Sequence, residues 1–155
     1  IRLWFVDGDP VAVHSLACPA HQIIHDLNSR QGGGDLLYDS LLVREEFRGE
    51  WITLLKNPYN FFKHGRRDAD GIVELHTEAT EIFLLFSILG LKRLSQQYDE
   101  VEGAYLVYFA ITKPSLLTED SKKHFEPLIQ ASPSVTNLGK QDFFEMYTAV
   151  KRTPT

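Results

Sequence analysis

The sequence has very little cysteine and no long hydrophobic run, and each of these absences excludes a class of protein. Cys18 is the only cysteine among 155 residues, so the chain cannot form the disulfide framework that small secreted domains use. The longest apolar stretch, Ile82–Leu91, is interrupted by Ser87 and Gly90 and is far shorter than the ~20 residues of a membrane-spanning helix. We therefore expect a cytoplasmic protein that does not enter a membrane.

An excess of positive charge is also missing. The formal net charge is −5 and the pI is about 5.6, so the chain as a whole does not attract nucleic acid or anionic lipid. Hydrophobic residues make up 43% of the chain and charged residues 24%, a balance typical of globular proteins. Because 155 residues is the usual size of one domain, we expect a single helical domain over residues 1–155.

Strand-like alternation is scarce, and helical periodicity runs through most of the chain. Asp9 and Pro10 are typical of a helix start, and the pattern that they open continues to the glycines at 32–34, with Pro19 predicting a kink or a division into two pieces. A second helix is expected from a cap at Asp35 to Asn57-Pro58, and a third from a cap at Thr77 through Leu89. A fourth is expected from a capping box at Asp99 and Glu102 to Lys113-Pro114. Two more are expected at Glu119–Gln130, where Pro127 bends or ends the helix, and at Gln141–Lys151.

These patterns predict an all-α fold, an irregular bundle of five to seven helices. The helix capped at Thr77 is apolar on nearly every side, so we expect it to be the central and most buried one. The segment Tyr59–Ile72 has no sustained period and is expected to be a loop with at most one short helical turn.

A column of histidines marks the first long helix. His14, Cys18, His21 and His25 fall within about 60° of arc on that helix. Neutral imidazole and thiolate are good ligands for divalent transition metals, and a pair such as His21 and His25 can hold one ion from a single helix face. The spacing therefore predicts a metal site at His14, His21 and His25, with a further ligand supplied from elsewhere, for example by His64.

Three other interpretations of this column remain open. The histidines can edge the buried face and bond to backbone or water, with Cys18 as a small core residue. They can form a contact that responds to pH, because imidazole titrates near neutrality. Cys18 can also pair with His14 or His21 as nucleophile and base, which requires a thiol of low pKa in a cleft.

A second feature is a basic and aromatic segment at residues 56–67. It carries four formal positive charges and three aromatic rings in an acidic chain. Arginine forks and aromatic faces hold phosphates and stack on bases, so a nucleotide or a single-stranded nucleic acid is a candidate ligand. Alternatively, Phe61 and Phe62 anchor the segment in the core, and Asp68 and Asp70 neutralise the arginines before them.

Motifs with a defined chemical mechanism are absent from the sequence: Gly-x-Gly-x-x-Gly, a phosphate-binding loop, Gly-x-Ser-x-Gly, Cys-x-x-Cys and His-Glu-x-x-His. No histidine follows a glutamate at the i+3 spacing of a di-iron bundle. The sequence therefore contains no complete catalytic motif, and the three consecutive glycines are interpreted as a connector.

Two groups of residues form a recognisable pattern. The first is Gly8-Asp9-Pro10-Val11 with His14 and His21, and the second is Asn60-Phe61-Phe62-Lys63-His64 with Arg67-Asp68. Together they resemble a family of small uncharacterised bacterial all-α proteins. The resemblance covers about half of the chain. It implies a helical fold, a bacterial cytoplasmic setting and a joint role for His14, His21, His64, Arg67 and Asp68, without supplying an activity. The helical nucleases of prokaryotic defence systems are a further comparison, but their Arg followed four to six residues later by His is missing.

Two hypotheses of function follow. In the first, a pocket joins His14 and His21 to the His64 segment and binds a metal or a small anionic ligand, with Arg67 and Asp68 beside it. In the second, the protein is a homodimeric interaction module in which exposed parts of Tyr105–Phe109 or Phe143–Tyr147 form the interface and the histidines are structural.

Overall fold

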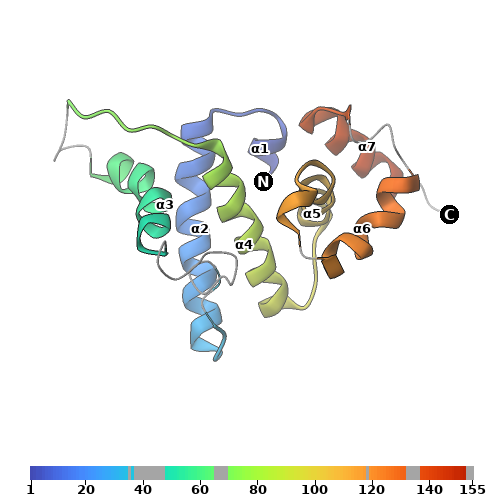
Figure 1. Cartoon of the computed structure of the whole chain (residues 1–155), viewed down its shortest axis with the longest axis horizontal. Helices are drawn as coiled ribbons and strands as arrows, with labels where there is room; N and C mark the ends of the chain where they lie inside the picture. Colours follow the sequence, from blue (N-terminus) through green and yellow to red (C-terminus); the bar gives the residue numbers. More distant parts are fainter. Residues whose placement is uncertain (35, 37–47, 65–69, 118, 132–136, 153–155) are drawn as a thin grey trace. The chain divides into compact units, whose positions relative to one another are not determined.

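The chain is described by a computed structural model that covers residues 1–34, 36, 48–64, 70–117, 119–131 and 137–152. Within these ranges there are seven α-helices and one short 3-10 helix, and no strand (Figure 1). The elements are α1 (Arg2–Phe5), α2 (Pro10–Arg30), α3 (Arg48–Lys63), α4 (Thr77–Ser95), α5 (Glu100–Thr112), η2 (Pro114–Leu116), α6 (Glu119–Ala131) and α7 (Lys140–Arg152). The predicted all-α class and helix number are confirmed, whereas the short elements α1 and η2 were not predicted.

The chain divides into two compact units. One unit is Asp9–Gln97 and contains α2, α3 and α4, while the other consists of Ile1–Gly8 together with Tyr98–Thr155. The expectation of one domain over residues 1–155 stays a prediction. No helix in the described ranges has both the length and the apolar character needed to cross a bilayer.

Helix α2 forms where the sequence predicts it. The side chain of Asp9 accepts a hydrogen bond of 2.8 Å from the backbone N–H of Ala12, and Pro10 occupies the first turn, where no N–H is needed. Pro19 lies inside the helix without dividing it. Beyond Gln31 the chain turns at Gly32, whose φ of +74° favours glycine. The predicted start and end are therefore confirmed, and α2 is one helix.

Helix α4 lies along α2 in the same unit (Figure 1). Its buried side has an unusually close approach at Gly90, where an added Cβ would lie 2.6 Å from Cγ2 of Ile24. The cap of α4 is His76 rather than the predicted Thr77, and it makes no side-chain capping bond. That α4 is the central helix of the fold stays a prediction.

Helix α3 corrects two predictions. It does not end at Asn57-Pro58 but runs through them to Lys63, so the expected loop begins five residues later than Tyr59. A proline inside a helix removes one backbone bond, and here the loss is offset by burial, because Pro58 and Leu55 are both buried in the unit. The expected cap at Asp35 lies outside the described residues.

The other unit is built around an aromatic cluster contributed by α1, α5 and α7. Its rings contact one another at centroid distances of 4.5 to 6.4 Å and belong to Trp4, Phe5, Tyr105, Tyr108, Phe143 and Phe144. Tyr105, Phe109 and Phe143 are buried and belong to the core of the unit. A dimer interface at exposed parts of Tyr105–Phe109 or Phe143–Tyr147 stays a prediction.

The capping box that opens α5 is confirmed. The side chain of Asp99 accepts from the backbone N–H of Glu102 at 2.7 Å, and the side chain of Glu102 accepts from the N–H of Asp99 at 2.9 Å. Helix α6 continues through Pro127, so this proline does not end it.

Candidate ligand pocket

The unit Asp9–Gln97 contains a pocket of about 340 Å³ between α2, α3 and α4. The described residues that line it are Cys18, Pro19, His21, Gln22 and Ile23 from α2, Lys56, Tyr59, Asn60 and Lys63 from α3, and Phe83 from α4. Pockets of 300–1,000 Å³ are the usual size for small ligands.

The contribution of α3 follows from the helical spacing. Lys56, Tyr59, Asn60 and Lys63 stand at positions i, i+3, i+4 and i+7, which lie on one face of an α-helix. This alignment requires that the helix continue through Pro58. Because α3 continues to Lys63, two lysines and an aromatic ring lie together on the pocket wall.

The contribution of α2 is part of the histidine column. His21 is buried and lines the pocket, its ring lies edge-on to Phe83 with centroids 5.3 Å apart, and it stacks on His25 at 6.2 Å. Cys18 lines the pocket one turn earlier. His14, a further turn back, does not line it.

Behind the pocket wall, His14 links α2 to α4 in a short hydrogen-bonded chain. Its Nδ1 is 2.8 Å from Oγ1 of Thr80, and its Nε2 is 3.3 Å from Sγ of Cys18. All three residues are buried, and His14 is 0% exposed. Both ring nitrogens of His14 are thus engaged within the protein.

Burial controls the protonation of His14 and Cys18. Desolvation lowers the pKa of His14 and raises the pKa of the Cys18 thiol to about 12, because the charged form of each group is disfavoured away from water. Cys18 and His14 are in hydrogen-bond contact, as a nucleophile and its base would be. The raised pKa, however, keeps the thiol protonated at neutral pH. The low pKa that a cysteine nucleophile requires is not found.

The described residues contain no group of three or more His, Cys, Asp or Glu side chains placed to hold a metal ion. His14, His21 and His25 share one side of α2 without forming such a group. The hypothesis of a metal site at these residues gains no support from the part of the chain that the structure covers.

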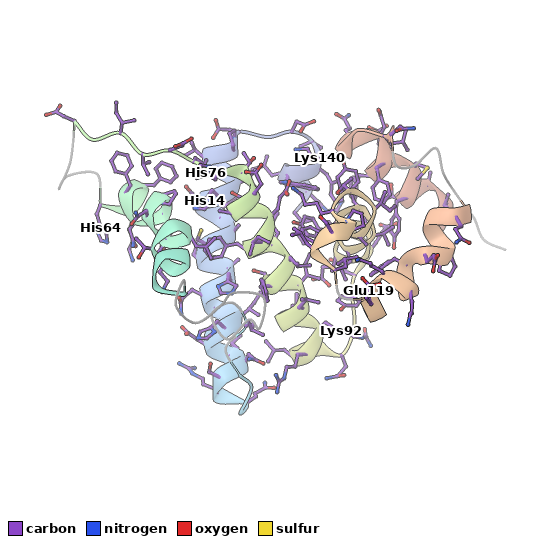
Figure 2. All side chains as sticks on the ribbon, viewed as in Figure 1. His14, His64, His76, Lys92, Glu119 and Lys140 are labelled. Atoms are coloured by element: carbon purple, nitrogen blue, oxygen red, sulfur yellow. The ribbon has the colours of Figure 1, made fainter. Side chains whose placement is uncertain are left out.

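His64, a further predicted site residue, is not brought to the pocket. His64 is exposed, follows the end of α3 and lies on the outer side of that helix, away from His14 (Figure 2). It does not line the pocket. Arg67 and Asp68, which the resemblance joined to these histidines, lie outside the described residues.

The sequence singled out residues 56–67 as a candidate ligand-binding segment but did not predict its helical part. Lys56, Tyr59, Asn60 and Lys63 share one face only because α3 continues past Pro58, where a loop was expected. No sequence pattern indicated that Gln22 and Phe83 line the pocket or that Thr80 bonds to His14. These positions depend on how the helices pack.

Comparisons of the chain with protein-family models, with curated proteins and with solved structures find no match. The resemblance to small bacterial all-α proteins stays a prediction. The pocket is therefore interpreted from its own geometry.

Proposed function

We propose that the pocket binds a small anionic molecule. The observation that carries this proposal is the charge of the lining: the described residues around the pocket include Lys56 and Lys63 and no Asp or Glu. This pattern reverses that of the whole chain, in which 21 acidic residues outnumber 16 Lys and Arg. Positive side chains at a concave surface with low-dielectric walls concentrate anions.

The uncharged part of the lining indicates the body of the ligand. Pro19, Ile23, Phe83 and the ring of Tyr59 offer apolar surface, while the amides of Gln22 and Asn60 offer hydrogen bonds. A pocket of this kind suits a molecule with an apolar or aromatic body and at least one carboxylate or phosphate group. The proposal concerns binding, and no reaction is assigned.

The test compares benzoate with benzamide, which share a ring and differ in charge. We expect benzoate to raise the melting temperature of the protein in a concentration-dependent way, because a ligand that binds only the folded state stabilises it. Benzamide should produce a much smaller shift at the same concentration. Isothermal titration calorimetry would then give the dissociation constants directly.

Variants assign the effect to the pocket. Lys56→Gln and Lys63→Gln should each weaken benzoate binding, whereas Lys123→Gln, the same change at an exposed position of α6 outside the lining, should leave it unchanged. Equal binding of benzoate and benzamide, or binding that survives both pocket variants, would contradict the proposal.

A further inference from the structure

From the burial of the side chains that line the pocket, we infer that its ligand is a monoanion with an apolar tail, bound tail first. The tail lies against the buried floor of the pocket, and the negative group stays at the exposed mouth. This inference rests on the anion pocket proposed above and specifies the class and the orientation of its ligand.

The floor of the pocket is formed by the lining side chains that are buried. They are Cys18 and His21 of α2 and Phe83 of α4, which are 5%, 1% and 3% exposed. The rings of His21 and Phe83 pack edge-on, with centroids 5.3 Å apart. Burial raises the pKa of the Cys18 thiol to about 12, so this group is neutral. The floor therefore consists of two rings and a neutral thiol, which favour contact with an apolar group.

The mouth of the pocket is formed by the lining side chains that are exposed. Three of them are polar, namely Gln22 of α2 and Asn60 and Lys63 of α3, and Ile23 is the apolar exception. Nζ of Lys63 lies 5.8 Å from the centre of the Tyr59 ring. Among the described residues, no carboxylate forms an ion pair with Lys63. The mouth therefore offers a positive charge and two amides to a negative group.

Helical geometry separates the floor from the mouth. His21 and Gln22 are consecutive in α2, and a step of about 100° turns the first side chain into the unit and the second toward solvent. On α3, the exposed Lys63 lies one turn beyond the half-buried Tyr59. The polar groups named above are thus on the side of the pocket that faces water.

This arrangement determines which end of a ligand lies deeper. A carboxylate placed against the floor would lose its hydration among rings and a neutral thiol, which is costly. At the mouth it keeps part of its hydration and contacts Lys63. An apolar tail gains most where it is removed from water, which is at the floor. The pocket volume of about 340 Å³ is in the range that small ligands of this kind occupy.

Two benzoates of matched size provide the test. Para-ethylbenzoate and para-(hydroxymethyl)benzoate have the same number of heavy atoms and the same charge, and they differ in whether a methyl or a hydroxyl group ends the substituent opposite the carboxylate. Calorimetry should show para-ethylbenzoate binding at least about fivefold more tightly than para-(hydroxymethyl)benzoate and than benzoate, because its ethyl group reaches the floor.

Variants at the two ends of the pocket separate their roles. Lys63→Gln should weaken the binding of both para-substituted compounds by the same factor, because it acts on the carboxylate and leaves the floor unchanged. Cys18→Ser, which replaces the thiol of the floor by a hydroxyl, should reduce the preference for the ethyl compound. Lys123→Gln, at an exposed position of α6, should change neither affinity. Far-UV circular dichroism checks the helix content of each variant, and the ligand comparison on the unmodified protein is decisive even where a variant does not fold.

The outcomes separate this inference from the proposed function. If the two para-substituted compounds bind equally well, the substituent does not reach the floor, and the inference is wrong while the anion pocket stands. Tighter binding of para-(hydroxymethyl)benzoate, or unchanged binding in Lys63→Gln, would also overturn the inference. If neither these compounds nor benzoate bind, both the inference and the proposed function are wrong.

Discussion

Thr80 on α4 and His14 on α2 are joined by a buried hydrogen bond of 2.8 Å between Oγ1 and Nδ1. It connects residues 66 positions apart in the sequence and lies directly behind the pocket wall, because the other ring nitrogen of His14 meets Cys18. A polar contact in this position fixes how α2 and α4 pack on one another, since a buried group without its partner is costly.

Removing the hydroxyl group of Thr80 should therefore destabilise the protein. We expect Thr80→Val, which keeps the shape of the side chain, to lower the free energy of unfolding by about 1–3 kcal/mol, because Nδ1 of the buried His14 loses its hydrogen-bond partner. Urea denaturation measures this loss. Thr53→Val is the matched control: Thr53 is exposed and its hydroxyl donates to the backbone carbonyl of Gly49 in its own helix, so its effect should stay within about 0.5 kcal/mol.

Acidification should weaken the fold through His14. Burial holds the pKa of His14 below its ordinary value of 6.5, so the folded protein favours the neutral ring and the unfolded chain binds the proton more readily. The contribution of His14 to stability is therefore complete above pH 6.5 and is lost as the pH falls below that value. Urea denaturation of the unmodified protein and of His14→Gln at pH 7.5 and 5.5 measures the effect. Equal losses of stability in the two proteins would contradict this assignment.

The Cys18 thiol should react slowly in the folded protein. Its pKa of about 12 leaves very little thiolate at pH 7.5, whereas an exposed cysteine with a pKa near 8.5 is partly ionised. We expect alkylation by iodoacetamide to be on the order of a thousandfold slower in buffer than in 6 M guanidinium chloride, measured by mass spectrometry. Rapid alkylation of the folded protein would show that the thiol is reactive and would revive its interpretation as a nucleophile.

Gly90 should not tolerate a methyl group. Alanine is the better helix former by about 1 kcal/mol, but a Cβ at this position would lie 2.6 Å from Cγ2 of Ile24, a branched atom next to its own backbone. Overpacking of this kind costs about 1–3 kcal/mol, so we expect Gly90→Ala to lower the melting temperature. The control is Gly49→Ala in α3, where no atom of the described residues lies within 4 Å of the added Cβ and the same change should raise the melting temperature slightly. A stable Gly90→Ala variant would show that α2 and α4 can separate at this point.

Local signals predicted most of the helices. Asp9-Pro10 and the pair Asp99 and Glu102 act through backbone groups one turn away, so their effect depends on neighbouring residues alone, and both helix starts are found where predicted. The end of α3 was predicted wrongly by the same reasoning. Pro58 is a strong local signal against a helix, but its burial in the packed unit outweighs the lost backbone bond.

The candidate site divides in the same way. The column of His14, Cys18 and His21 on one helix face follows from helical periodicity, and the sequence is sufficient to place these residues together. Helical periodicity does not predict the different surroundings of these residues: His14 bonds to Thr80, while His21 lies at a pocket wall. Spacing along one helix does not reveal which residues of a second helix approach it.

The sequence alone determined that the chain is helical, where most of its helices begin, and which side chains share a helix face, because these properties depend on residues within one or two turns. Only the tertiary structure decided that Lys56 and Lys63 face a pocket beside His21, and that His64 is exposed outside it. The physical reason is that pockets, buried hydrogen bonds and shifted pKa values arise from contacts between helices distant in the sequence, and no single helix contains the information that sets them.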